Sequence, residues 1–381
     1  MTQFAGRRRW LASLVAWSFA ALSLLPLLAC ATGGPTIPRR TPPPPGNPIQ
    51  EYPVSGTDKM SGWLSGITAG PAGDDHVWFT GFNFSGVGRV SETEPISHQY
   101  PASSSMNPAI TVGSDNHLWI TQETADAPNP HTITCVKTDG TTCGVYRIPY
   151  VPAIDDPLSR TGRWLWDITA ADNGYLYFTE RYADRIGCFD PRAPDPVTGF
   201  KSCGEKLTAT PNSQPFEITQ GPDGKLYFTE FGKNQIGCMT KALDLCGEWA
   251  VEGTPTGITV GPDNELWFTE SDGDKVARFS VKEHKVTAEA PLAAGSQPWG
   301  ITKGPPGDYA VWFTERGGNK IARFSVLDLD AFHYPPEEFL VPTANSEPSG
   351  ITVGPDHHIW FVEANRSAPP SKIGRTTRAY P

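Results

Sequence analysis

The chain has 381 residues; 38 are Gly and 38 are Pro, 19% are charged and 11% are aromatic. This composition disfavours long helices, because an interior Gly costs a helix about 1 kcal/mol and an interior Pro about 3 kcal/mol. It is also too apolar and aromatic for a disordered chain. The formal net charge of −10 argues against a nucleic-acid partner. An all-β protein with many turns and a substantial core remains.

Residues 1–29 are typical of a signal peptide. Arginines at 7–9 precede an almost wholly apolar stretch at 11–25, and Leu27-Leu28-Ala29-Cys30 follows. The last four residues resemble a bacterial lipobox, which implies cleavage before Cys30 and lipidation of its sulfur. The alternative is an uncleaved anchor helix over residues 10–29. In both cases we expect the rest of the chain outside the cytoplasm, and lipidation would make it a membrane-anchored bacterial lipoprotein.

Residues 30–48 follow as a tether. Seven prolines lie between residues 31 and 48, and such a segment forms a semi-rigid polyproline spacer. We therefore expect the folded domain to begin at residue 49 and to extend to residue 381.

A repeat of 40 to 58 residues runs through this domain. Each unit carries an Ile-Thr pair before a turn and a second apolar strand, and the isoleucines are Ile67, Ile110, Ile168, Ile218, Ile258, Ile301 and Ile351. In the fifth unit, strands are expected at 257–260, 266–269, 275–279 and 286–291. Seven four-stranded units predict a seven-bladed β-propeller.

An aromatic residue recurs in the second strand of every unit, and its column is Trp78, Trp119, Tyr177, Tyr227, Trp267, Trp312 and Trp360. A residue present in every blade favours packing between blades over a stripe of ligand contacts. The seventh unit lacks a fourth strand, and residues 49–55 resemble the missing one. We predict that this N-terminal strand completes the last blade and closes the ring, which removes two exposed edges.

Six cysteines besides Cys30 are expected to form disulfides in an exported chain. Three occupy one column at the end of the third strand, and three precede Gly near the start of the fourth. The repeat therefore predicts the pairs Cys135–Cys143, Cys188–Cys203 and Cys238–Cys246. A metal site is the rival interpretation, but no CxxC spacing supports it.

One face of the ring should collect the residues just before each Ile and just after each second strand. The second set includes the glutamates Glu180, Glu230, Glu270, Glu315 and Glu363. Five carboxylates around a channel mouth suit a cation. A repeated structural bond to backbone or to a neighbouring blade is the favoured alternative.

Blades three and four depart from the repeat on this face. Asp167 and Glu217 replace Gly or Ala before Ile-Thr, Trp166 and Phe216 stand beside them, and Trp299 is expected across the ring. Acids beside aromatic side chains suit a ligand with a flat face and a cationic or hydroxylated part. The equally open alternative is that the aromatic rings plug the channel and the acids face bulk water.

Three segments resemble the repeats of the virginiamycin B lyase (streptogramin B lyase) family: GITVGPD at 257–263, LWFTE at 266–270 and NKIAR at 319–323. The resemblance covers about residues 49–381 and implies a seven-bladed propeller. Characterised lyases of the family open a cyclic depsipeptide antibiotic by elimination at its ester, assisted by Mg²⁺. A base takes the proton alpha to the carbonyl, and the ester oxygen leaves. Mg²⁺ is therefore the one cofactor that the resemblance implies.

The positions of the family's histidines hold Trp299 and Ser349 here, and neither an indole nor a hydroxyl is a useful base near neutral pH. The family's acids are matched by Glu347 and, in uncertain register, by Glu363. The resemblance makes these two glutamates the candidate catalytic and metal-binding residues. The candidate ligand contacts are Trp166, Asp167, Phe216, Glu217, Trp299 and Ser349.

These observations predict an exported, membrane-tethered monomer that binds a small-molecule or protein ligand at the propeller mouth and lacks the family's antibiotic lyase activity. The alternative is an Mg²⁺-dependent carbon–oxygen lyase that uses non-standard residues, such as Asp167 and Glu217 with Glu347. A third possibility is a structural envelope protein with an inert channel.

Overall fold

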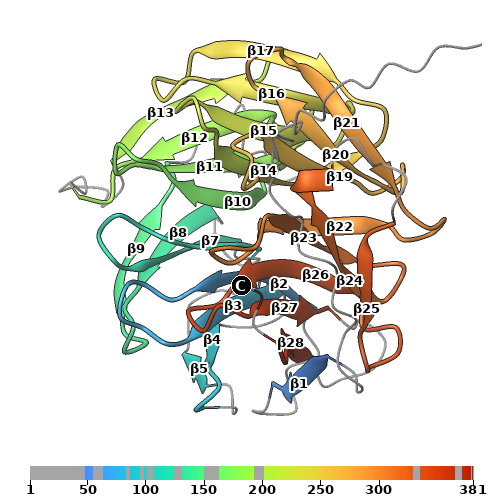
Figure 1. Cartoon of the computed structure of the whole chain (residues 1–381). Coiled ribbons are helices and arrows are strands. Elements are labelled where there is room, and N and C mark those ends of the chain that lie inside the picture. The colour runs from blue at the N-terminus through green and yellow to red at the C-terminus, as the bar shows by residue number, and fades with distance from the viewer. Residues whose placement is uncertain are drawn as a thin grey trace, which may run out of the picture. The chain divides into compact units, whose positions relative to one another are not determined.

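The structure is a computed structural model (Figure 1). It describes residues 48–54, 63–82, 86–94, 98–100, 106, 108–123, 131–149, 163–192, 201–328, 335–364, 371–378 and 380, all within the compact unit Pro44–Pro381. The predicted signal peptide, Cys30 and all of the tether except its last residue lie outside the described residues. Within the described residues, no helix is long and apolar enough to cross a membrane.

Seven antiparallel sheets of four strands form the ring, which confirms the predicted seven-bladed propeller (Figure 1). The first three blades are β2–β5 (Trp63–Ala69, Val77–Phe82, Val87–Val90, His98–Tyr100), β6–β9 (Ile110–Val112, Leu118–Glu123, His131–Val136, Thr142–Arg147) and β10–β13 (Leu165–Ala170, Leu176–Glu180, Arg185–Phe189, Ser202–Leu207).

The fourth to sixth blades repeat the pattern. They are β14–β17 (Pro215–Gln220, Leu226–Glu230, Gln235–Met239, Leu245–Ala250), β18–β21 (Pro255–Val260, Leu266–Glu270, Lys275–Ser280, Lys285–Pro291) and β22–β25 (Pro298–Lys303, Ala310–Glu315, Lys320–Ser325, Glu337–Leu340). The seventh consists of β26–β28 (Pro348–Val353, Ile359–Glu363, Lys372–Thr376) and β1 (Ile49–Pro53). The described residues also contain two short 3₁₀ turns, Arg181–Ala183 and Val326–Asp328.

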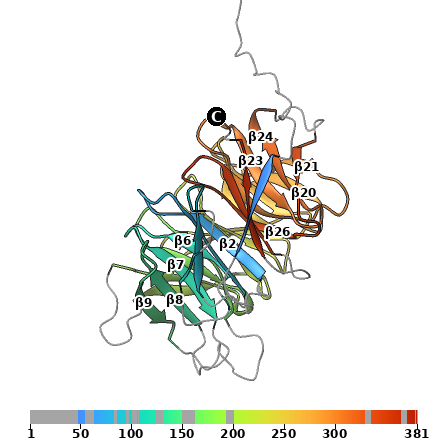
Figure 2. The same ribbon diagram turned by 90° about the horizontal axis from the view of Figure 1, so that it is seen from below.

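The first strand of each blade contacts that of the next, from β2 through β6, β10, β14, β18, β22 and β26 back to β2. Figure 2 shows three of these strands, β2, β6 and β26. Closure occurs as predicted. β1 pairs with β28 (Figure 1), Tyr52 stacks on Trp360 with ring centroids 5.4 Å apart, and Lys372 Nζ lies 2.5 Å from Glu51 Oε2.

The aromatic column packs between blades. All seven residues of the column are at most 1% exposed, which confirms the packing interpretation. Each indole also donates a hydrogen bond to the Asp four residues earlier, such as Trp267 Nε1–H to Asp263 Oδ1 at 3.0 Å. A Cβ at Gly261 would lie 2.4 Å from the Trp267 ring, so the Gly-Pro-Asp turn lets the ring lie against it.

The residue opposite the aromatic ring on the third strand is either Arg or Cys. In blades five, six and seven the guanidinium pairs with the turn Asp, as Arg375 Nε does with Asp356 Oδ2 at 2.7 Å. In blade one Arg89 lies 3.7 Å from Glu94 instead. In blades two, three and four it is Cys, and the three disulfides are those predicted: Cys135–Cys143, Cys188–Cys203 and Cys238–Cys246. Each links the third strand of a blade to its fourth.

Candidate functional site

The first strands line a narrow central channel of about 140 Å³, whose walls include Ile67, Ile110, Ile301 and Ile351 together with Asp167 and Glu217. Ligand pockets for molecules of drug size usually have about 300–1,000 Å³. The channel itself therefore accommodates water or a small ion rather than a macrocyclic substrate.

In blades five to seven the position before Ile must be Gly, because the next blade approaches it closely. A Cβ at Gly257 would lie 2.4 Å from the backbone oxygen of Trp299, and one at Gly350 would lie 2.2 Å from that of Ser65. Such distances do not occur between real atoms, so a side chain here would push the blades apart.

Asp167 and Glu217 occupy the same position in blades three and four, and each reaches across to the next blade. Asp167 Oδ2 accepts the N–H of Ile218 at 2.9 Å, and Glu217 Oε2 accepts the N–H of Ile258 at 3.2 Å. The carboxylates thus replace the direct backbone contact with a side-chain bridge.

The channel also changes the acidity of this pair. Burial raises the pKa of Asp167 to about 7. Burial and the neighbouring Asp167 raise the pKa of Glu217 well above its usual value. Ionisation of both carboxyl groups at once is therefore disfavoured. Both side chains line the channel and are partly exposed.

The three predicted aromatic side chains form one group. Trp166 stacks on Phe216 with centroids 4.5 Å apart, and Trp299 meets Phe216 edge-on at 5.5 Å. Trp299 thus touches Phe216 rather than standing apart across the ring. The contact joins blades four and six past blade five, where the equivalent residue is the small Thr256.

Phe216 has no exposed surface, whereas Trp166 and Trp299 are partly exposed. The structure therefore gives Phe216 a supporting role under the two indoles, and it fulfils part of the plugging alternative. Trp166 and Trp299 remain the rings that a ligand can reach. We call these three residues, with the two arginines described next, the aromatic mouth.

Two arginines at the mouth were missed by the sequence analysis. The guanidinium carbon of Arg181 lies 5.0 Å from the ring centroids of both Trp166 and Phe216 and 4.7 Å from that of Phe231. Arg316 lies over Trp299 at 4.8 Å. Both follow directly after a repeated Glu, at a position whose residue varies between blades. This variation between blades is the sequence signal that could have identified them.

Ser349 plays a different part. Its side chain is buried, and its Oγ donates to the backbone oxygen of Leu64 in the next blade at 3.3 Å. Ser65, the equivalent residue in blade one, bonds Pro108 in the same way. The structure gives Ser349 this bond between blades, and its predicted ligand contact stays a prediction without geometric support.

The five repeated glutamates are fully buried and do not line the channel. A strand alternates its side chains between two faces. Each Glu therefore shares a face with the buried Phe two positions earlier, such as Phe178 before Glu180, and points between blades. Glu180, for example, binds Arg163 at 3.0 Å. Their full burial contradicts a cation-binding ring at the mouth. The structural bond is present for Glu180 and Glu270, whereas Glu230, Glu315 and Glu363 have no hydrogen-bond partner among the described residues.

Glu363 and Glu347 do not fit an Mg²⁺ site as arranged. Glu363 is fully buried, and neither of its carboxylate oxygens has a hydrogen-bond partner among the described residues. Burial raises its pKa to about 8. Glu347 Oε2 accepts a hydrogen bond from Arg316 Nη2 at 2.9 Å. Mg²⁺ needs an octahedral set of ionised or polar oxygens, whereas here one acid is favoured in its neutral form and the other faces a guanidinium.

Potential metal ligands gather elsewhere. Among the described residues, the two groups of three or more are His117 with Cys135 and Cys143, and Asp74 with Asp75 and His76. The first contains a disulfide. In the second, Asp74 already binds His76 and the indole of Trp78. The predicted metal and catalytic roles of Glu347 and Glu363 thus stay predictions that this geometry does not favour.

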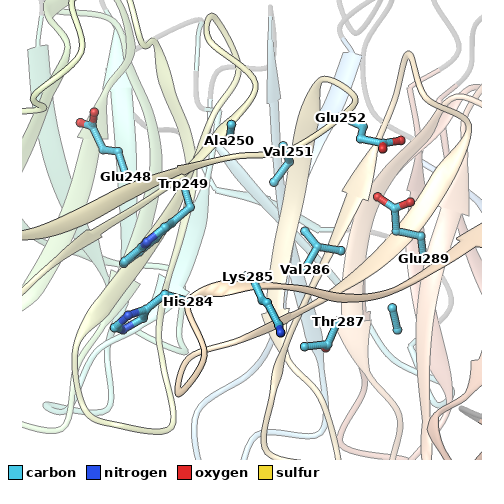
Figure 3. Close-up of a pocket in the computed structure, with 11 residues that line it drawn as sticks. Glu248, Trp249, Ala250, Val251, Glu252, His284, Lys285, Val286, Thr287 and Glu289 are labelled. Atoms are coloured by element: carbon cyan, nitrogen blue, oxygen red, sulfur yellow. The ribbon is translucent and has the colours of Figure 1, made fainter.

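A larger groove of about 900 Å³ lies on the outside of the ring, between β17 and β21 (Figure 3). Trp249 and His284 stack in it with centroids 4.7 Å apart. Its charged side chains have partners: Glu252 and Glu289 bind Lys275 at 2.5 and 3.1 Å, Lys285 binds Glu283 at 2.7 Å, and Glu248 accepts a hydrogen bond from Thr210.

Fold and site together define a closed seven-bladed propeller with an aromatic, arginine-bearing mouth over a carboxyl-lined channel. The model of the "Virginiamycin B lyase family" matches residues 155–379. The chain belongs to this family. No curated protein sequence matches the chain closely enough to count as a relative.

Solved structures agree with this assignment. A streptogramin B lyase superimposes with a TM-score of 0.69 at 27% identity, covering 86% of this chain and 96% of that one. A catalytically inactive histidine-to-alanine variant of virginiamycin B lyase from Staphylococcus aureus, solved with quinupristin, gives 0.67 at 27% identity, covering 86% and 98%. A hydrazine synthase from Kuenenia stuttgartiensis, at 14% identity, TM-score 0.63 and coverages of 84% and 97%, shares the fold alone.

Proposed function

We propose that this protein is an exported, membrane-tethered binding module that takes a ligand at the aromatic mouth and does not open streptogramin B antibiotics. The observation that carries the proposal is the Arg316–Glu347 pair, seated on Trp299. By family resemblance, position 347 should hold a metal-associated acid and position 299 a basic histidine. Here position 347 holds a Glu that is paired with Arg316, and position 299 holds an indole.

The described mouth also lacks another base of the family's kind. Among the channel-lining residues there is no histidine, and one lyase relative is inactive once a histidine is replaced. The indoles and guanidiniums of the mouth bind through stacking and hydrogen bonds instead. The side chains of the mouth are therefore sufficient for binding.

Export and tethering are supported by the three disulfides, which persist in oxidising compartments, and by the lipobox-like sequence before Cys30. Cys30→Ser should move the protein from the membrane fraction to the soluble fraction. A variant that stays in the membrane would favour the uncleaved anchor helix.

Binding at the mouth is tested by screening small molecules with flat rings against the wild type and the Trp166→Ala/Trp299→Ala double variant. Both indoles are partly exposed, so their removal should abolish binding without unfolding the domain. An exposed aromatic elsewhere, Tyr309→Ala (55% exposed), is the matched control. Equal binding by wild type and double variant would reject the mouth as the site.

A second candidate function rests on Asp167. Its pKa of about 7 in the channel suits a general base, so an elimination that uses Asp167 and Glu217 in place of histidine is chemically consistent. In this case Asp167→Asn abolishes the reaction, and stacking at Trp299 contributes only to substrate affinity. The narrow channel disfavours it, because a macrocycle cannot bring its alpha carbon to Asp167 through about 140 Å³.

A further inference from the structure

Arg181 is a partly buried cation that has no acid partner in the part of the chain that the structure describes. Its backbone N–H donates to Trp164 O at 3.0 Å, which fixes it at the end of β11. Among the described residues, its buried Nε has no hydrogen-bond partner and no carboxylate contributes to the electrostatics of the guanidinium. Arg316 differs, because Glu347 neutralises it.

Four rings surround this guanidinium: Trp166, Tyr182, Phe216 and Phe231, at 4.7 to 5.3 Å from its carbon. Ring faces attract a cation, so they hold the guanidinium in place. They accept none of its five N–H groups in the way that oxygen does. The side chain is therefore oriented by the rings, while its hydrogen-bonding capacity stays unused.

The acids of the channel do not supply the missing anion. Asp167 and Glu217 direct oxygens to the backbone of the next blade, and burial favours their protonated forms. The Arg181 guanidinium thus carries a charge that the described residues leave uncompensated at the mouth.

We propose that Arg181 anchors the carboxylate of an anionic ligand whose flat part stacks on Trp166 and Trp299. The inference rests on the proposed binding function and reverses the expected charge of the ligand, because the cation among the aromatic rings belongs to the protein. A guanidinium binds a carboxylate through two parallel hydrogen bonds. The net charge of −10 favours a monoanion over a polyphosphate, which the rest of the surface would repel.

The test uses three small probes with the same ring: indole-3-acetate, its neutral amide, and the cation tryptamine. Affinities are measured by calorimetry on the full-length protein. The acid should bind at least about tenfold tighter than the amide, since a charge-assisted hydrogen bond contributes about 1.5–3 kcal/mol. Arg181→Gln should remove this preference, and Arg181→Lys should retain part of it.

The matched control is Arg147→Gln, because Arg147 is an exposed arginine on β9 and its loss should leave the preference intact. The ratio of acid to amide affinity is the readout, since a general weakening of the fold would not change it. Equal affinity of acid and amide, or a preference that survives in Arg181→Gln, would overturn the proposal. So would tighter binding of tryptamine than of the acid, or no binding of any probe at millimolar concentration.

These failures are distinguishable from failure of the binding function itself. If the amide or tryptamine binds in a manner that Trp166→Ala/Trp299→Ala abolishes, the mouth binds ligands and only the anion anchor is wrong. If no ring compound distinguishes the double variant from the wild type, the binding function falls as well.

Discussion

Blades three and four and blades five to seven share one repeat but differ at the channel. In blades five to seven, Gly before Ile lets neighbouring backbones approach closely. In blades three and four, Asp167 and Glu217 bridge the same gap with side chains. The difference shows that the repeat maintains the ring by close packing, and that two blades relax this packing where ionisable and aromatic groups gather.

The buried glutamates extend the comparison and give the largest expected effect. Glu180 of blade three pairs with Arg163, whereas Glu363 of blade seven has no hydrogen-bond partner among the described residues. Burial nevertheless raises the pKa of both carboxyl groups to about 8. When the pKa of a carboxyl group is higher in the folded state than its unfolded value of about 4.5, ionising the group costs more in the folded state. The stability of the fold then declines as the pH rises above about 4.5. The stability should therefore be full near pH 4 to 5 and fall as the pH rises toward 8.

Burial also raises the pKa of Glu230 to about 8 and that of Glu315 to about 7. Together with Glu363 they should lower the free energy of unfolding by several kcal/mol between pH 5 and pH 8. Urea titrations at the two pH values measure this decline. Glu363→Gln should make it shallower, and the exposed Glu252→Gln should not. A stability that rises from pH 5 to pH 8 in the wild type would contradict the account.

The disulfides distinguish the same sets of blades, because blades two to four carry them and the other four do not. Cys188→Ala/Cys203→Ala opens a link of sequence separation 15 and should cost about 3 kcal/mol by the loop-entropy model. Thermal unfolding of the double variant measures the loss. The control is the Cys135–Cys143 pair, whose separation of 8 should make its removal slightly less costly. A double variant as stable as the wild type would show that the Arg and Cys columns are interchangeable.

The smallest expected effect compares the channel position itself. Gly350→Ala should destabilise the fold by about 2 kcal/mol, because its Cβ would meet Ser65 O at 2.2 Å and the blades must separate. Asp167→Ala removes a side chain from a site already open to one, so it should change stability by less. Denaturant midpoints of the two variants decide the matter, and equal losses would erase the distinction between the two sets of blades.

Much of the fold was predictable because its signals are local and repeated. The isoleucine and aromatic columns gave the blades, the missing last strand gave the closure, and the two cysteine columns gave the disulfide pairs. The direction of the repeated glutamates was misjudged, because a strand alternates its faces and Glu230 therefore follows Phe228 between blades instead of facing the mouth.

The site was less predictable because its contacts join distant blades. Trp299 reaches Phe216 only because Thr256 of the intervening blade is small, and no sequence spacing encodes this. Arg181 and Arg316 gain their importance from the rings above which they lie. The burial of Phe216 and Ser349 likewise depends on how neighbouring blades close on them.

The central claim is that this family member has exchanged the lyase chemistry for binding. The most direct test incubates the full-length protein with a streptogramin B antibiotic and Mg²⁺ and follows the antibiotic by mass spectrometry. Trp299 and Ser349 stand at the positions of the family's histidines, and Glu347 is paired with Arg316. The cyclic antibiotic should therefore persist unchanged. Conversion to the linear form by the wild type, abolished by Glu347→Gln, would contradict the claim.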